Sequence, residues 1–197
     1  MKPVLIRMML LSFLTVGAAM AQNSDLAFLF GADGQTSSTI SGDGVASRFG
    51  FGFQINFAEQ LHETAAGQLY VEVPLMIATH FQDTVSGSIT DEEKDSIFFT
   101  PGVRWRFTPQ KRISFYAAAG AGIGSLGTSA SYVGPGVVSN SDNRDVTFAF
   151  GFGGGIDFRL TRLLSLRAEG RDFVTRAGLG ESGHNHAFFT AGIGFHF

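Results

Sequence analysis

The chain has 197 residues, of which 14 are lysine or arginine, 17 are aspartate or glutamate and none is cysteine. This acidic balance argues against nucleic acid as a partner, because nucleic-acid binding depends on basic side chains that meet phosphates. The lack of cysteine excludes a disulfide framework and any thiolate metal site. The 21 phenylalanines and 26 glycines favour one domain whose strands face hydrocarbon outside and enclose a tight interior.

The first 21 residues have the pattern of a secretory signal peptide. Lys2 and Arg7 precede a short apolar stretch, and small residues then lead to an A-x-A cleavage site, Ala19-Met20-Ala21. The apolar stretch is shorter than the roughly 18 residues that a membrane helix needs. We therefore expect residues 1–21 to be a signal peptide and residues 22–197 to be one exported domain. Without Lys2 and Arg7 its charge is 12 basic minus 17 acidic groups, or −5.

Eight later segments alternate between apolar residues and small or polar ones. Side chains along a strand point to opposite faces in turn, so this period gives each segment one apolar face and one small or polar face. The expected strands are residues 25–32, 48–57, 68–78, 96–107, 112–123, 146–159, 163–171 and 186–197. Proline has no N–H to donate to a neighbouring strand, so Pro74 in the third strand and Pro101 in the fourth predict bulges or local bends.

The connections between these strands alternate in length. Short gaps follow the fourth and sixth strands, whereas long polar segments follow the first, third, fifth and seventh. The gap at 58–67 is longer than this pattern predicts and could extend a strand or form a local helix. Short turns at one end and long loops at the other are typical of outer-membrane barrels, whose strands need about 9–11 residues to cross the bilayer. The sequence therefore predicts an all-β fold, an eight-stranded antiparallel up-and-down transmembrane β-barrel with its short turns in the periplasm.

Aromatic residues end every second strand. If both termini are periplasmic, the even-numbered strands run toward the periplasm, and the last outward residue of each is a phenylalanine. Aromatic side chains concentrate at the interfaces between bilayer and water. The predicted interfacial girdle comprises Phe57, Trp105, Phe107, Phe158 and Phe197.

The opposite phase of the strands carries five basic and three acidic residues. They are Glu72, Arg104, Arg106, Asp157, Arg159, Arg167, Glu169 and Arg171. The interior of an eight-stranded barrel is just wide enough for side chains to fill, and an isolated buried charge is very costly. We therefore expect these groups to pair in a structural lumen charge network. The alternative is a gated polar path for ions or small solutes.

Motifs that would indicate catalysis or cofactor binding are weak. Gly122-x-Gly124-x-x-Gly127 matches the dinucleotide fingerprint but is not followed by a helix that could receive the pyrophosphate. His184 and His186 share a strand face but have no clear third metal ligand. Acidic residues at 91–95 lack the ligand spacing of a calcium loop. We expect no catalytic residues, no metal and no cofactor.

Four segments carry a family resemblance: FTPGVR at 99–104, FYAAAGAG at 115–122, LRAEGRD at 166–172 and GFHF at 194–197. Through them the chain resembles the OmpA/OmpW-type family of small outer-membrane β-barrel proteins. The resemblance implies a location in the outer membrane of a Gram-negative bacterium, among outer-membrane lipid and lipopolysaccharide. It also implies that the barrel assembly machinery recognises the C-terminal strand, with Phe195 and Phe197 as the assembly signal.

The resemblance marks an architecture and leaves three classes of function. The first is a non-enzymatic membrane protein whose barrel anchors surface loops and supports envelope integrity or adhesion. The second is a narrow channel for ions or small solutes, as OmpW-type barrels suggest. The third is a lipid A-modifying enzyme, for which the sequence offers no recognisable motif. We expect the first class.

Overall fold

The structure, a computed structural model, describes residues 23–33, 47–86, 88–109, 111–134, 137–175 and 185–197. These ranges contain nine strands. They are β1 (Ser24–Asp33), β2 (Ser47–Thr64), β3 (Gly67–Ser86), β4 (Ser88–Phe99), β5 (Gly102–Arg106), β6 (Ile113–Gly134), β7 (Val137–Arg159), β8 (Leu164–Thr175) and β9 (Asn185–His196). No helix in the same ranges has the length and apolar character of a membrane span.

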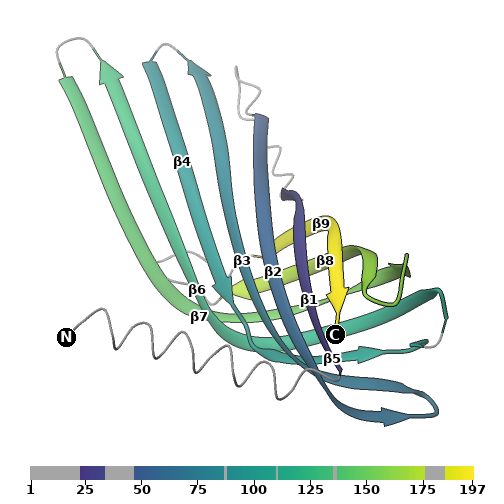
Figure 1. Ribbon diagram of the computed structural model, residues 1–197. Coiled ribbons are helices and arrows are strands. Elements are labelled where there is room, and N and C mark those ends of the chain that lie inside the picture. Colours follow the sequence, from purple (N-terminus) through teal and green to yellow (C-terminus); the bar gives the residue numbers. More distant parts are fainter. Residues whose placement is uncertain (1–22, 34–46, 87, 110, 135–136, 176–184) are drawn as a thin grey trace, which may run out of the picture.

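The strands form a closed antiparallel ring (Figure 1). The first strand, β1, pairs with β2 on one side and with the last strand, β9, on the other. β4 and β5 share one position in the ring, because both pair with β3 and β6. The described residues thus fill eight strand positions, and the predicted eight-stranded up-and-down barrel is confirmed.

Both prolines of the expected strands lie at the interruption between β4 and β5. The β3–β4 ladder stops at Phe99 and the β3–β5 ladder resumes at Gly102, so that Thr100 and Pro101 lie opposite Val73 and Pro74 in the gap. β3 itself continues through Pro74 and keeps a regular register with β2 there. One local break therefore accommodates both prolines, neither of which can donate a hydrogen bond to a neighbouring strand. The sequence predicts a separate bulge or bend at each proline.

Two hairpins, β3–β4 and β6–β7, run well beyond the rest of the ring (Figure 1). Residues 79–86, 88–95, 127–134 and 137–144 stay in register as four strands of one sheet, here called the hairpin extension. Residues 47–51 of β2 pair with its first part, at residues 79–83. The prediction of long loops after the third and fifth expected strands is therefore wrong. Ladder hydrogen bonds join backbone groups, so serine-, threonine- and aspartate-rich segments continue the pairing without apolar alternation.

The opposite end of the ring carries the short turns. β2 continues to Thr64, so the segment 58–67 is mostly strand and ends in a two-residue turn before Gly67. The φ of Gly67 is 154°, a conformation that side chains rarely adopt and glycine reaches freely. The β5–β6 and β7–β8 turns lie at this end, as do Ser24 and Phe197, whose backbone carbonyl and N–H join at 2.9 Å.

The outward face of the ring is apolar. Phe30, Phe148 and Phe189 are 65%, 58% and 68% exposed, and many other large apolar side chains share this face. Contiguous exposed apolar surface of this kind marks contact with a membrane or a partner. On β6 the outward apolar run covers residues 113–123, which matches the length of about 9–11 residues that a tilted span requires.

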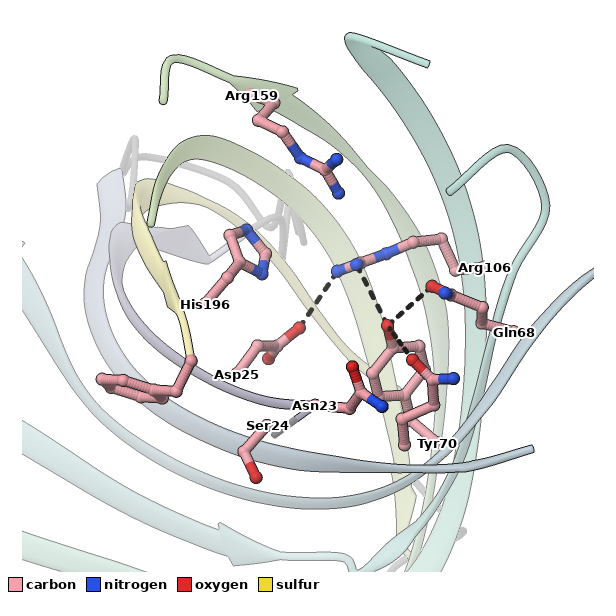
Figure 2. Close-up of a pocket in the computed structure, with 10 residues that line it drawn as sticks. Asn23, Ser24, Asp25, Gln68, Tyr70, Arg106, Arg159 and His196 are labelled. Atoms are coloured by element: carbon pink, nitrogen blue, oxygen red, sulfur yellow. Dashed lines mark hydrogen bonds and ion pairs between the residues drawn. The ribbon is translucent and has the colours of Figure 1, made fainter. Parts of the chain in front are cut away.

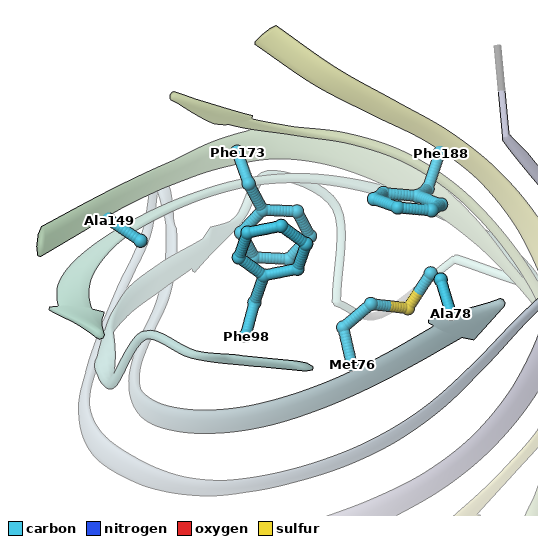
Figure 3. Close-up of a cluster of buried hydrophobic side chains, with 6 residues drawn as sticks. All are labelled: Met76, Ala78, Phe98, Ala149, Phe173 and Phe188. Carbon is cyan, nitrogen blue, oxygen red and sulfur yellow. The ribbon is translucent and has the colours of Figure 1, made fainter. Parts of the chain in front are cut away.

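The interior has two layers. Toward the hairpin extension lies an apolar cluster made of Met76, Ala78, Phe98, Ala149, Phe173 and Phe188 (Figure 3). The Phe98 and Phe173 rings stack with centroids 4.5 Å apart and planes 8° from parallel. A polar layer fills the lumen toward the short turns. The small or polar inward face that the sequence predicts therefore describes only one of the two layers.

Candidate functional site

The polar layer contains four arginines and four carboxylates, each at most 4% exposed. Strand alternation directs all of them inward, opposite to the exposed apolar side chains. They are Asp25 on β1, Glu72 on β3, Arg104 and Arg106 on β5, Asp157 on β7, and Arg167, Glu169 and Arg171 on β8. Four positive and four negative groups balance, which removes the large cost of burying an uncompensated charge.

Asp25 is the centre of the half that lies nearer the short turns. Its Oδ1 accepts a hydrogen bond from Arg104 Nη2 at 2.7 Å, and its Oδ2 accepts from Arg106 Nη2 at 3.0 Å and Arg167 Nη2 at 3.1 Å. Asp157 accepts from two of the same arginines, from Arg167 Nε at 2.6 Å and from Arg106 Nη2 at 2.9 Å. Two carboxylates therefore hold three guanidinium groups in fixed positions.

Arg171 is the centre of the half that lies nearer the aromatic cluster. Its guanidinium donates to Glu72 and, through Nε, to Glu169 Oε1 at 2.6 Å. Glu169 also accepts from Gln54 Nε2 at 2.9 Å and from the Tyr116 hydroxyl at 2.6 Å. Four side chains from β2, β3, β6 and β8 are thus tied to Arg171 directly or through Glu169.

Arg104 and two tyrosine rings join the halves. Arg104 Nε lies 3.2 Å from Glu72 Oε2, while the other end of the same guanidinium pairs with Asp25. The Arg104 guanidinium carbon lies 5.2 Å from the Tyr70 ring centroid and 5.3 Å from that of Tyr116, within the range of cation–π attraction. Arg104 therefore links the two halves into one continuous network of charged side chains.

Seven of the eight residues that the sequence predicts for the lumen belong to this network. The exception is Arg159, which is half-buried at the end of β7 and has no ion-pair partner among the described residues. Asp25 was not among the predicted residues, although the apolar phase of the first expected strand includes Leu26 and so directs Asp25 inward. Gln54, Tyr70 and Tyr116 were also not predicted, and the same alternation would have found them.

A cavity of about 120 Å³ lies between the network and the short turns (Figure 2). Asp25, Tyr70, Arg106, Arg159 and His196 are among the residues that line it. The Tyr70 hydroxyl accepts from Arg106 Nη1 at 3.2 Å and donates to Gln68 Oε1 at 2.8 Å. The strand ends that meet here give the cavity polar walls.

The residues of the predicted girdle lie near the short-turn end of the ring. Phe57, Phe107 and Phe197 are 42%, 50% and 56% exposed, and Phe158 and Trp105 are half-buried. The Arg112 guanidinium carbon lies 5.2 Å from the centroid of the Phe158 ring. Their contact with the bilayer interface stays a prediction.

The weaker candidates from the sequence are the histidine pair, the dinucleotide-like glycine motif and the acidic segment. His184 lies outside the described residues, and His186 is buried with its ring centroid 5.2 Å from that of Phe98. The glycines of the dinucleotide-like motif lie on β6, and residues 91–95 lie on β4. Among the residues that the structure describes, no group of three or more His, Cys, Asp or Glu side chains could hold a metal ion.

A family model described as "Outer membrane protein beta-barrel domain" matches residues 9–197. No curated protein matches the chain.

Three solved structures are similar to the chain in fold. The outer membrane protein OprG from Pseudomonas aeruginosa is 11% identical, with 90% of this chain and 97% of that one covered and a TM-score of 0.56. The outer membrane protease OmpT from Escherichia coli is 6% identical over 89% and 97%, with a TM-score of 0.58. Ail of Yersinia pestis, in complex with the heparin analogue sucrose octasulfate, is 12% identical over 89% and 97%, with a TM-score of 0.51. Identities this low establish the fold alone.

Proposed function

Because the chain belongs to the outer membrane protein beta-barrel domain family, we propose that it is a non-enzymatic integral outer-membrane protein that holds the hairpin extension at the cell surface. In this role it supports envelope integrity or adhesion. The main support for this proposal is that side chains fill the lumen. The charge network and the aromatic cluster occupy the interior, so the outer wall and the hairpin extension are the surfaces left for contact.

The filled lumen argues against the alternative of a narrow channel. A solute moving along the barrel axis would have to separate Arg171 from Glu72 and Glu169 and then pass the stacked Phe98 and Phe173 rings. Separating a buried ion pair leaves uncompensated charges and costs about 3–5 kcal/mol for each pair. The interior thus supports a closed barrel that serves as an anchor.

The strands are longer than a membrane span needs. β6 has 22 residues and β7 has 23. At about 3.3 Å per residue β6 is roughly 70 Å long, whereas a tilted span uses only about 9–11 residues. The outward apolar run of β6 ends at Ile123, so the hairpin extension continues from the point where the lipid-facing surface stops.

The proposal includes an orientation and an assembly route. Residues 1–21 direct the chain across the inner membrane of a Gram-negative bacterium, the short turns face the periplasm, and the hairpin extension projects outward among lipopolysaccharide. Phe195 and Phe197 form the signal for the barrel assembly machinery, and the aromatic girdle lies at the periplasmic interface. Wild-type amounts of a Phe197→Ser variant in outer-membrane fractions would contradict the assembly role.

A shortened hairpin tests the surface role. Ser129 and Asp142 are directly paired, so residues 130–141 can be replaced by Asn-Gly, which forms a two-residue hairpin turn. A strain that lacks the protein is complemented with this variant or with the full-length chain. We expect both to reach the outer membrane in heat-modifiable form, but only the full-length chain to restore surface attachment and detergent resistance. Full restoration by the shortened chain would contradict the proposal.

Incubation with labelled lipopolysaccharide tests the absence of catalysis. We expect the purified, folded barrel to leave the lipid chemically unchanged. Time-dependent release of an acyl chain, absent after heat unfolding of the barrel, would identify a lipid A-modifying enzyme instead.

A further inference from the structure

Among the described residues, one arginine of the lumen has no ion-pair partner. The four arginines and four carboxylates of the network balance one another. Arg159 adds a ninth charge, which is positive, and its guanidinium makes no ion pair or side-chain hydrogen bond within the described part of the chain. A half-buried guanidinium that faces a polar cavity is stabilised when an anion shares that cavity.

The cavity at the short turns offers more than one donor. Figure 2 shows Arg159 entering from β7 with its guanidinium directed into the cavity that Arg106 and His196 also line. Arg106 is 2% exposed and donates through Nη1 to Tyr70 and through Nη2 to Asp25 and Asp157, so one of its two Nη1 hydrogens has no acceptor among the described residues. The volume of about 120 Å³ corresponds to a few water molecules at about 30 Å³ each. It therefore has room for a tetrahedral oxyanion.

Asp25 supplies the one side-chain carboxylate among the residues that line this cavity, which also include Phe197 with its terminal carboxylate. The two oxygens of Asp25 already accept from Arg104, Arg106 and Arg167 at 2.7–3.1 Å, so three positive groups offset its charge toward the cavity. The surrounding turns carry three exposed positive side chains, Lys111, Arg112 and Arg162. The negative side chains at this end of β2 are the glutamates at 59 and 63. Acidic groups thus do not dominate the electrostatic potential at the opening of the cavity.

We propose that this cavity is a binding site for a small oxyanion of the phosphate class, with Arg159 as its principal ligand and Arg106 as the second. Arg159 supplies a planar fork of donors, the geometry that suits phosphate oxygens. The inference goes beyond the proposed surface role and does not depend on it, because the cavity lies at the end of the barrel opposite the hairpin extension.

The test is titration of the folded full-length barrel, in nonionic detergent, with inorganic phosphate. Binding is followed by calorimetry and by the nuclear magnetic resonance signal of the Arg159 Nε–H group. We expect saturable binding that shifts this signal, and an affinity at least about tenfold lower in Arg159→Gln, because one charge-assisted contact is lost. Arg159 makes no side-chain hydrogen bond or ion pair within the described part of the chain, so this variant should fold, which a heat-modifiability gel checks.

Arg162→Gln is the matched control, since it removes one positive charge from an exposed turn three residues away. We expect it to bind phosphate like the wild type. Equal weakening by both substitutions, or no saturable binding by the wild type, would overturn the proposal. A parallel titration with short-chain phosphatidylglycerol separates the two sources of the anion. Competition with phosphate would identify a lipid headgroup as a ligand of the same site, and its absence would identify the free anion.

Discussion

At the scale of single residues, the lumen depends on which charges face one another at short range. Asp25 accepts from three arginines and Glu169 accepts from Arg171, Gln54 and Tyr116. Each carboxylate therefore satisfies several donors, and removal of one leaves more than one buried donor without a partner. Such a loss costs more than the net contribution of any single hydrogen bond.

Glu169→Ala tests this dependence. The substitution leaves Arg171 with one carboxylate in place of two and removes the acceptor of Tyr116, so we expect a loss of about 3–5 kcal/mol in the free energy of unfolding. Urea unfolding in lipid vesicles measures it. Glu63→Ala is the control, because Glu63 is an exposed acidic residue near the short turns whose contact with Gln60 is long at 3.4 Å. A change of under about 0.5 kcal/mol in both variants would contradict a structural role for the network.

Alternation predicts which face a residue occupies but not its depth along the barrel. This is why the sequence predicts Glu72, Arg104 and Arg167 as network members, and why it groups Arg159 with them, although Arg159 makes no ion pair among the described residues. Asp25 was not predicted, although the expected strand 25–32 begins with it and alternation directs it inward. Which arginine meets which carboxylate depends on register across the ring, which no single strand encodes.

At the scale of elements, apolar alternation predicts the membrane-spanning part of each strand and stops where lipid contact stops. β6 illustrates the limit, because its expected end at residue 123 is the end of its outward apolar run, while the strand continues to Gly134. The continuation is held by backbone pairing with β4 and β7. The break between β4 and β5 was foreseeable from Pro101, but its position opposite Pro74 depends on the register of β3.

Matched substitutions on β6 test where the lipid-facing surface ends. Ala119 and Ser129 are both exposed and lie ten residues apart on the same face of the strand. We expect Ala119→Arg to lower the free energy of unfolding by about 2–4 kcal/mol, because arginine then faces the centre of the bilayer. Ser129→Arg lies in the hairpin extension and should change stability by less than about 0.5 kcal/mol. Unfolding in vesicles that gives equal costs for both would contradict this boundary.

At the scale of the whole molecule, two layers of different chemistry close one barrel. The charge network fixes the half nearer the short turns, and the stacked phenylalanines fill the half nearer the hairpin extension. The lipid-facing wall surrounds both layers, and the hairpin extension stands beyond them. The molecule therefore consists of a filled barrel and, beyond it, the hairpin extension.

Single-channel recording in planar bilayers tests the closed lumen most directly. The purified barrel, shown to be folded by its heat-modifiable mobility, is inserted and recorded over a range of voltages, with a wide porin as the positive control. A filled interior predicts a flat current without discrete openings, because both layers block the axis. Reproducible unitary steps from the folded barrel, absent from vesicles without protein, would contradict a closed anchor.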